Sequence, residues 1–171
     1  YVMLELGQPL HAFDLNKRQG AVRAGRPRAG ERFETLDHVH RTLSEDDLVI
    51  QDDRGTIGLA GTMGGLESEI DDATTDIALE AAYFTPGVVA RMARRHKLSS
   101  EASRRFERGV DRELAPYASA RAAALLLELG GGRYVGMTAV EAPELQSVIT
   151  MSSHEPSTVA GMPIEPATVL G

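Results

Sequence analysis

Short alternating or apolar runs dominate the first half of the chain and predict strands separated by turns. These runs occupy residues 11–15, 21–24, 32–36, 47–51, 56–60 and 77–82. Alternation with a period of two is typical of a half-buried strand. Gly, Asn and Asp gather between the runs, at 16–20, 25–30 and 52–55, as expected of turns. The first half is therefore predicted to be β-structure.

Helical spacing begins at Thr85-Pro86, a capping residue followed by a proline suited to the first helical position. In this first helix, Val88, Val89, Met92 and Ala93 share one face. A second helix is predicted from Ser99, as its cap, to Gly109.

A third helix is predicted from about residue 116 to 129, ending at a run of three glycines. Its apolar face is expected at the 3–4 spacing of Tyr117, Ala120, Ala124 and Leu127. Strands followed by helices indicate an α+β fold rather than an alternating α/β fold.

The 171 residues suffice for one sizeable core, and composition changes near residue 141. We expect a main domain at 1–141, a linker rich in Pro, Ser and Thr at 142–150, and a stub at 151–171 with too little apolar content to fold alone. The first residue is Tyr1 rather than Met, so we expect a piece of a longer intracellular protein.

Composition excludes several classes of chemistry. The chain has no cysteine, so disulfides, thiolate metal sites and a cysteine nucleophile are ruled out. Its longest apolar run, at 122–127, is far too short for a membrane span. The net charge is −7, yet residues 91–121 hold nine Lys or Arg against four Asp or Glu. Such a segment can meet a polyanion, although composition alone favours a solvated helical face.

The candidate chemical groups each have a plain structural alternative. The glycine cluster at 58–65 lacks the spacing of a phosphate loop or a dinucleotide fingerprint, so a tight turn is favoured. His11 lies between apolar residues, where a structural role is more common. His38 and His40 resemble a turn, and the sequence supports no metal site.

Glu80 is a carboxylate inside an apolar run, where burial without a partner is costly. It either points to solvent or waits in a pocket for a hydrogen-bond donor, and the pattern leaves both open. The segment 100–109 places hydroxyls and small residues at a helix start, which suits either ordinary capping or ligand binding.

Taken together and in order, segments 6–14, 59–65, 79–84 and 100–111 strongly resemble the editing domain of the β subunit of bacterial phenylalanyl-tRNA synthetase. The resemblance covers roughly residues 1–141 and implies a three-layer β/β/α arrangement. It also implies that the chain begins inside that domain and that residues 151–171 open the following one.

The resemblance implies hydrolysis of the ester in tRNA(Phe) mischarged with tyrosine. A pocket for phenylalanine rejects an added hydroxyl poorly, so a second site that selects the hydroxyl is useful. Glu80 would accept a hydrogen bond from the tyrosine phenol, and His11 would lie near the ester. Gly64 and Gly65 would line the pocket through backbone, and Ser100 and Ala102 would form the opposite wall.

The implied partners are the acceptor end of tRNA(Phe) and the α subunit of a cytoplasmic heterotetramer. No cofactor is implied for this segment, because ATP and magnesium serve other parts of the synthetase. A rival hypothesis is a non-catalytic tRNA-binding or scaffolding module on the same fold, for which His11 and Glu80 would be dispensable.

Overall fold

A computed structural model describes residues 1–140, 150–165, 167 and 168. The chain divides into two compact units, Tyr1–Tyr134 and Val135–Gly171. The strands of the first unit are β1 (Leu10–Asp14), β2 (Arg23–Gly25), β3 (Arg32–Glu34), β4 (His40–Thr42), β5 (Val49–Gln51), β6 (Thr56–Leu59), β7 (Met63–Gly64) and β8 (Ile77–Ala81). Its helices are α1 (Val2–Leu6), η1 (Leu66–Ser68), α2 (Pro86–Arg95), α3 (Glu101–Arg108) and α4 (Leu114–Gly130). The predicted α+β class is confirmed, with strands first and most helices later.

The strands form three small antiparallel sheets. β1 pairs with β8, β3 pairs with β4, and the largest sheet has the order β2-β5-β6-β7. A single bridge between Thr35 and Gly65 connects the β3–β4 hairpin to the end of β7. The β1–β8 ladder joins segments more than sixty residues apart, and this long-range pairing carries the candidate site.

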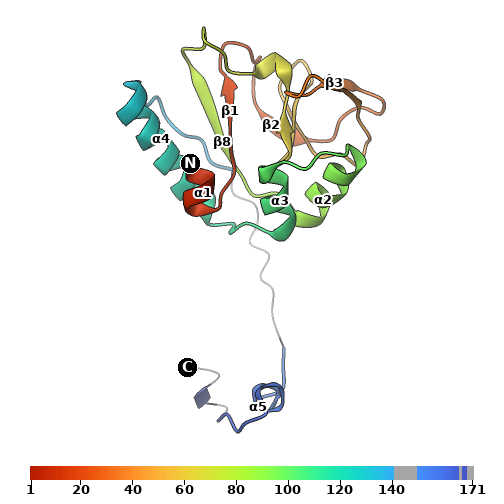
Figure 1. The fold of residues 1–171 in the computed structure, drawn as a ribbon, viewed down its shortest axis with the longest axis vertical. Helices are drawn as coiled ribbons and strands as arrows, with labels where there is room; N and C mark the ends of the chain where they lie inside the picture. The colour runs from red at the N-terminus through yellow and green to blue at the C-terminus, as the bar shows by residue number, and fades with distance from the viewer. Residues whose placement is uncertain (141–149, 166, 169–171) are drawn as a thin grey trace. The chain divides into compact units, whose positions relative to one another are not determined.

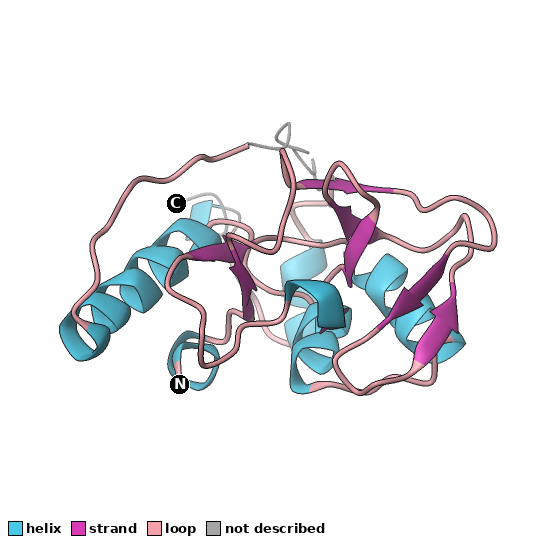
Figure 2. Ribbon diagram, turned by 90° about the horizontal axis from the view of Figure 1, so that it is seen from above, coloured by secondary structure: helices cyan, strands magenta, loops and turns pink. Residues whose placement is uncertain are grey.

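Within the first unit the β1–β8 ladder lies between two groups of elements (Figures 1 and 2). On one side are α1 and α4, where Val2 packs with Ala118 and Ala122. On the other are α2, α3 and the four-stranded sheet, whose core includes Phe13, Ile50, Ile57, Phe84, Val89 and Phe106. The Phe84 and Phe106 rings meet edge to face at 5.1 Å. The ladder is thus held from both sides by apolar packing.

The first two long helices begin and end close to where the sequence predicts. α2 starts at Pro86 and buries Val89, Met92 and Ala93, as expected. α3 ends at Gly109, but its cap is Ser100 rather than the predicted Ser99. Ser100 stands three residues before Ser103, so the two serines cap each other's backbone N–H groups at 3.0 Å.

The predicted face of α4 is wrong. Ala118 and Ala122 are its buried residues, whereas Tyr117 is 71% exposed and Leu127 is 38% exposed. Small side chains allow α4 to approach α1 and β8 closely, so the larger apolar residues turn outward. α1, β4 and β7, of five, three and two residues, were not predicted from the sequence.

The glycine cluster forms a turn between β6 and β7, with Gly61 in the left-handed region at φ 65°. This confirms the tight-turn interpretation of the segment. His38, also left-handed at φ 58°, lies in the turn before β4, as expected.

In the second unit, the short helix α5 (Glu155–Ala160) ends at a left-handed Gly161 and has no buried residues. The predicted linker at 142–150 falls, except for its last residue, outside the described residues. No helix in the described part of the chain is both long and apolar enough to span a membrane.

Candidate functional site

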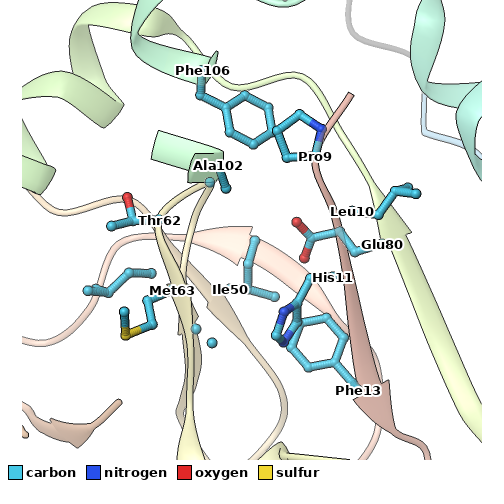
Figure 3. Close-up of a pocket in the computed structure, with 14 residues that line it drawn as sticks. Pro9, Leu10, His11, Phe13, Ile50, Thr62, Met63, Glu80, Ala102 and Phe106 are labelled. Carbon is cyan, nitrogen blue, oxygen red and sulfur yellow. The ribbon is translucent and has the colours of Figure 1, made fainter. Parts of the chain in front are cut away.

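A partly open cavity lies between the β1–β8 ladder, the β6–β7 turn and α3 (Figure 3). It encloses about 430 Å³ of empty space, including its open mouth. Its lining includes His11, Phe13, Thr62, Gly64, Glu80 and Ala102. These residues come from segments spread over ninety positions of the sequence, so the cavity exists only in the folded unit.

His11 and Glu80 are direct partners across the β1–β8 ladder. Side chains directly opposite in an antiparallel pair lie on the same face of the sheet, with Cβ atoms about 5 Å apart. Both project into the cavity, toward the turn that carries Thr62 and Met63 (Figure 3). The fold therefore brings a carboxyl and an imidazole together at one wall of the cavity.

Glu80 lacks a hydrogen-bond partner within the described residues, although it is half-buried. Desolvation by the surrounding protein raises the pKa of its carboxyl to about 7. A carboxyl in this state is a strong hydrogen-bond acceptor when ionised.

The His11 ring lies in a tight space. It meets the Phe13 ring edge to face, with centroids 4.4 Å apart. A Cβ at Gly64 would lie 2.4 Å from His11 Cε1 and 2.6 Å from Nε2, so only glycine leaves room for the ring. Burial lowers the pKa of His11, which favours the neutral imidazole. A neutral imidazole nitrogen can accept a proton.

Gln8 anchors the ladder on which the pair sits. Its side chain is fully buried, and Nε2 donates to the carbonyl oxygens of Ala82 at 2.9 Å and Pro9 at 3.0 Å. These bonds tie the chain just before β1 to the chain just after β8. Gln8 therefore helps to fix the register that sets His11 opposite Glu80.

The structure distributes the six residues proposed from sequence unevenly. His11, Gly64, Glu80 and Ala102 line the cavity. Gly65 is not among the lining residues, and a Cβ there would meet Phe33 Cε2 at 2.5 Å. The Ser100 hydroxyl caps α3 and donates to the Thr62 carbonyl at 2.7 Å, so it holds the α3 wall against the β6–β7 turn.

Several lining residues were not singled out from sequence. Phe13 follows His11 by two positions in a predicted strand, and that spacing places both on one face. Thr62, Met63 and Phe106 had no comparable signal, because their approach to the ladder depends on tertiary packing.

The described residues contain no group of three or more His, Asp or Glu side chains arranged to hold a metal ion. The polar chemistry available to the cavity is thus that of the imidazole, the carboxyl, the Thr62 hydroxyl and backbone groups.

Comparisons with known proteins agree with these observations. The family described as B3/4 domain matches residues 1–131. The chain is 53% identical to a phenylalanine–tRNA ligase beta subunit of Streptomyces avermitilis, over 99% of this chain and 21% of that protein. It is 55% identical to the same subunit of Corynebacterium glutamicum, over 99% of this chain and 20% of that protein. The chain thus spans about a fifth of the length of these relatives.

Proposed function

Because the chain belongs to the B3/4 domain family, we propose that it is a segment of a phenylalanine–tRNA ligase beta subunit whose cavity removes tyrosine from mischarged tRNA(Phe). The partners in this proposal are the acceptor end of that tRNA and the α subunit of the whole ligase, in the cytoplasm. ATP and magnesium belong to the aminoacylation reaction and have no role in the proposed hydrolysis.

The observation that carries the proposal is the carboxyl of Glu80 at the cavity wall, for which the described residues supply no hydrogen-bond donor. A tyrosine phenol can donate to it, and a phenylalanine ring cannot. With phenylalanine bound, the acceptor would stay unpaired and desolvated, at about 1–3 kcal/mol. The cavity would thus select the hydroxyl that a synthetic site for phenylalanine rejects weakly.

His11 is proposed to serve the hydrolysis itself. A water oxygen attacks the ester carbonyl carbon, and the bond from that carbon to the ribose oxygen breaks. The neutral imidazole accepts the proton that the water loses and returns a proton to the leaving ribose oxygen. Positioning of the water beside a reactive ester would supply a further part of the rate.

The experiment is deacylation of Tyr-tRNA(Phe) and Phe-tRNA(Phe) by the whole ligase carrying this segment. We expect Glu80→Ala to lower the tyrosine preference about 10- to 100-fold, because one recognition bond is lost. Glu107→Ala is the matched control, since Glu107 is an exposed glutamate of α3 outside the cavity lining.

His11→Ala should lower the rate for both esters, and His11→Asn should not restore it if the imidazole moves a proton. A wild-type ligase that binds tRNA without cleaving either ester would overturn the proposal in favour of the scaffolding module. An unchanged preference in Glu80→Ala would remove Glu80 from recognition.

A further inference from the structure

The basic segment at 91–121 has nine cations, and the structure divides them by their partners. Four share an ion pair with a carboxylate: Arg95, Arg104, Arg105 and Arg121. The guanidinium of Arg112 lies over the Tyr83 ring, 4.8 Å from its centroid. The remaining four have no carboxylate within 4.0 Å among the described residues: Arg91, Arg94, Lys97 and Arg108.

Three of these four cations lie on one exposed side of α2 or just after its end. Arg91 and Arg94 belong to the helix, and Lys97 follows its C-cap. Arg91, Arg94 and Lys97 are all exposed, and we call them the α2 basic face. The opposite face of the helix is buried through Val89 and Met92, so the orientation of α2 is fixed. α2 contains no acidic residue, unlike α3, where Glu101 engages two of the arginines.

A short segment joins Lys97, the last residue of the α2 basic face, to the α3 wall of the candidate cavity. Lys97 and Ser100 are three residues apart, so their Cα atoms lie within about 11 Å. Ser100 donates to the carbonyl of Thr62, and Thr62 lines the cavity. A long ligand that fills the cavity and extends past this wall toward α2 would therefore reach Lys97 first, and then Arg94 and Arg91.

We propose that the α2 basic face binds the phosphate backbone of the RNA whose 3′ end occupies the cavity. This inference rests on the proposed hydrolysis of an aminoacyl-tRNA. Cations about one helical turn apart fit a polyanion, whose repeated phosphates need no fixed geometry. The chain as a whole has a net charge of −7, whereas this face is positively charged. A local positive charge of this kind attracts and orients a polyanion.

Lys97 offers an independent sign of a role outside the fold. It follows the C-cap of α2 in the left-handed region, at φ 53°, where glycine is the usual residue. Lys97→Gly should therefore raise the melting temperature of the chain. If Lys97 contacts phosphate, the same change should weaken the interaction with RNA, which a merely structural residue would not do.

The test uses the whole ligase with Arg91→Ala, Arg94→Ala and Lys97→Ala combined. We expect the KM for deacylation of Tyr-tRNA(Phe) to rise about tenfold or more, with kcat within about twofold. The slope of log(kcat/KM) against the logarithm of the salt concentration should decrease in magnitude by about 2–3. This is close to one for each phosphate contact that is lost. Aminoacylation with phenylalanine reports whether the ligase remains intact.

The matched control combines Arg28→Ala, Arg32→Ala and Arg133→Ala. These cations are also exposed, have no carboxylate within 4.0 Å among the described residues, and change the net charge equally. They should leave KM and the salt dependence unchanged. Equal effects in both triple variants would show a general charge effect and overturn the proposal.

Binding of uncharged tRNA(Phe) to the same variants is measured in parallel. A wild-type ligase without deacylase activity would overturn the proposed function, and the binding experiment would still test the α2 basic face. An unchanged KM and unchanged tRNA binding would overturn the inference. Loss of α-subunit association with tRNA binding intact would assign the face to a protein partner instead.

Discussion

Asp47 and Glu80 are carboxylates of the same unit, each with a histidine beside it, and their surroundings are opposite. Asp47 is fully buried and accepts hydrogen bonds from the Ser44 N–H and His96 Nε2, both at 2.8 Å, and from Arg95. Burial alone would raise the pKa of Asp47, but these bonds outweigh burial and hold it below its usual value. Glu80 has no such donor within the described residues, and burial raises its pKa to about 7.

This difference separates an acid that holds the fold together from one that is proposed to bind a ligand. Asp14 and Asp52 follow Asp47: each is buried, and each accepts two or more hydrogen bonds. Folding normally pairs the polar groups that it removes from water, and the half-buried carboxyl of Glu80 has no such partner among the described residues. Glu80 lines the cavity, and in the proposed function the tyrosine phenol donates to it there.

The largest expected effect is loss of stability in Asp47→Ala. The change strips three donors of their acceptor and leaves the positive charge of Arg95 without its buried partner, so we expect about 3–4 kcal/mol lower free energy of unfolding. Urea unfolding of the chain measures this. Asp46→Ala is the control: Asp46 also pairs with Arg95, at 3.4 Å, but its side chain is 84% exposed, so the loss should be below about 0.5 kcal/mol. Similar losses in the two variants would contradict the comparison.

The sequence was informative about local structure and much less so about this contrast. The strand runs and the starts of α2 and α3 follow from alternation, proline and serine positions. Asp47 showed no sign of its role, because it closes an acidic run before a strand and its partners Arg95 and His96 lie almost fifty residues away.

The candidate site depends on register rather than on local pattern. His11 and Glu80 lie opposite each other because β1 pairs with β8, more than sixty residues later in the sequence. The hydrogen bond from Gln8, just before β1, to the Ala82 carbonyl, just after β8, supports this pairing. No periodicity within either strand specifies that pairing, so the residues alone left Glu80 open. Only the resemblance to a known family pointed to its role.

The next effect is a pH-dependent gain in stability from Glu80→Gln. The folded pKa of about 7 lies above the ordinary value of 4.5, so the unfolded state releases this proton first as pH rises. Wild-type stability contributed at this position is therefore lost between about pH 4.5 and 7. The difference between these two pKa values corresponds to about 3 kcal/mol, and the partial exposure of Glu80 reduces the effect. We therefore expect the variant to match the wild type near pH 4 and to exceed it by about 2 kcal/mol near pH 8.

Unfolding curves at several pH values measure this difference, and Glu107→Gln controls for the loss of an exposed charge. Asp47 has the opposite sign, since its stabilising contribution is present above its ordinary pKa of 3.8 and is lost as pH falls from 3.8 toward the lower folded pKa. A difference between Glu80→Gln and wild type that does not vary with pH would show that Glu80 is well solvated or well partnered in the folded state.

The smallest expected effect comes from exchanging each histidine for glutamine. His96→Gln should cost about 1 kcal/mol, because it weakens a 2.8 Å bond to a buried, ionised acceptor. His11→Gln should change stability by less than about 0.5 kcal/mol, since the described residues give the His11 ring no hydrogen-bond partner and the longer side chain can extend into the cavity.

The deacylation rate should show the opposite order of effects, with His11→Gln lowering the rate and His96→Gln leaving it near that of the wild type. The two histidines would then divide as their carboxylates do, one serving the fold and the other the cavity, whereas equal stability losses would place His11 in the framework.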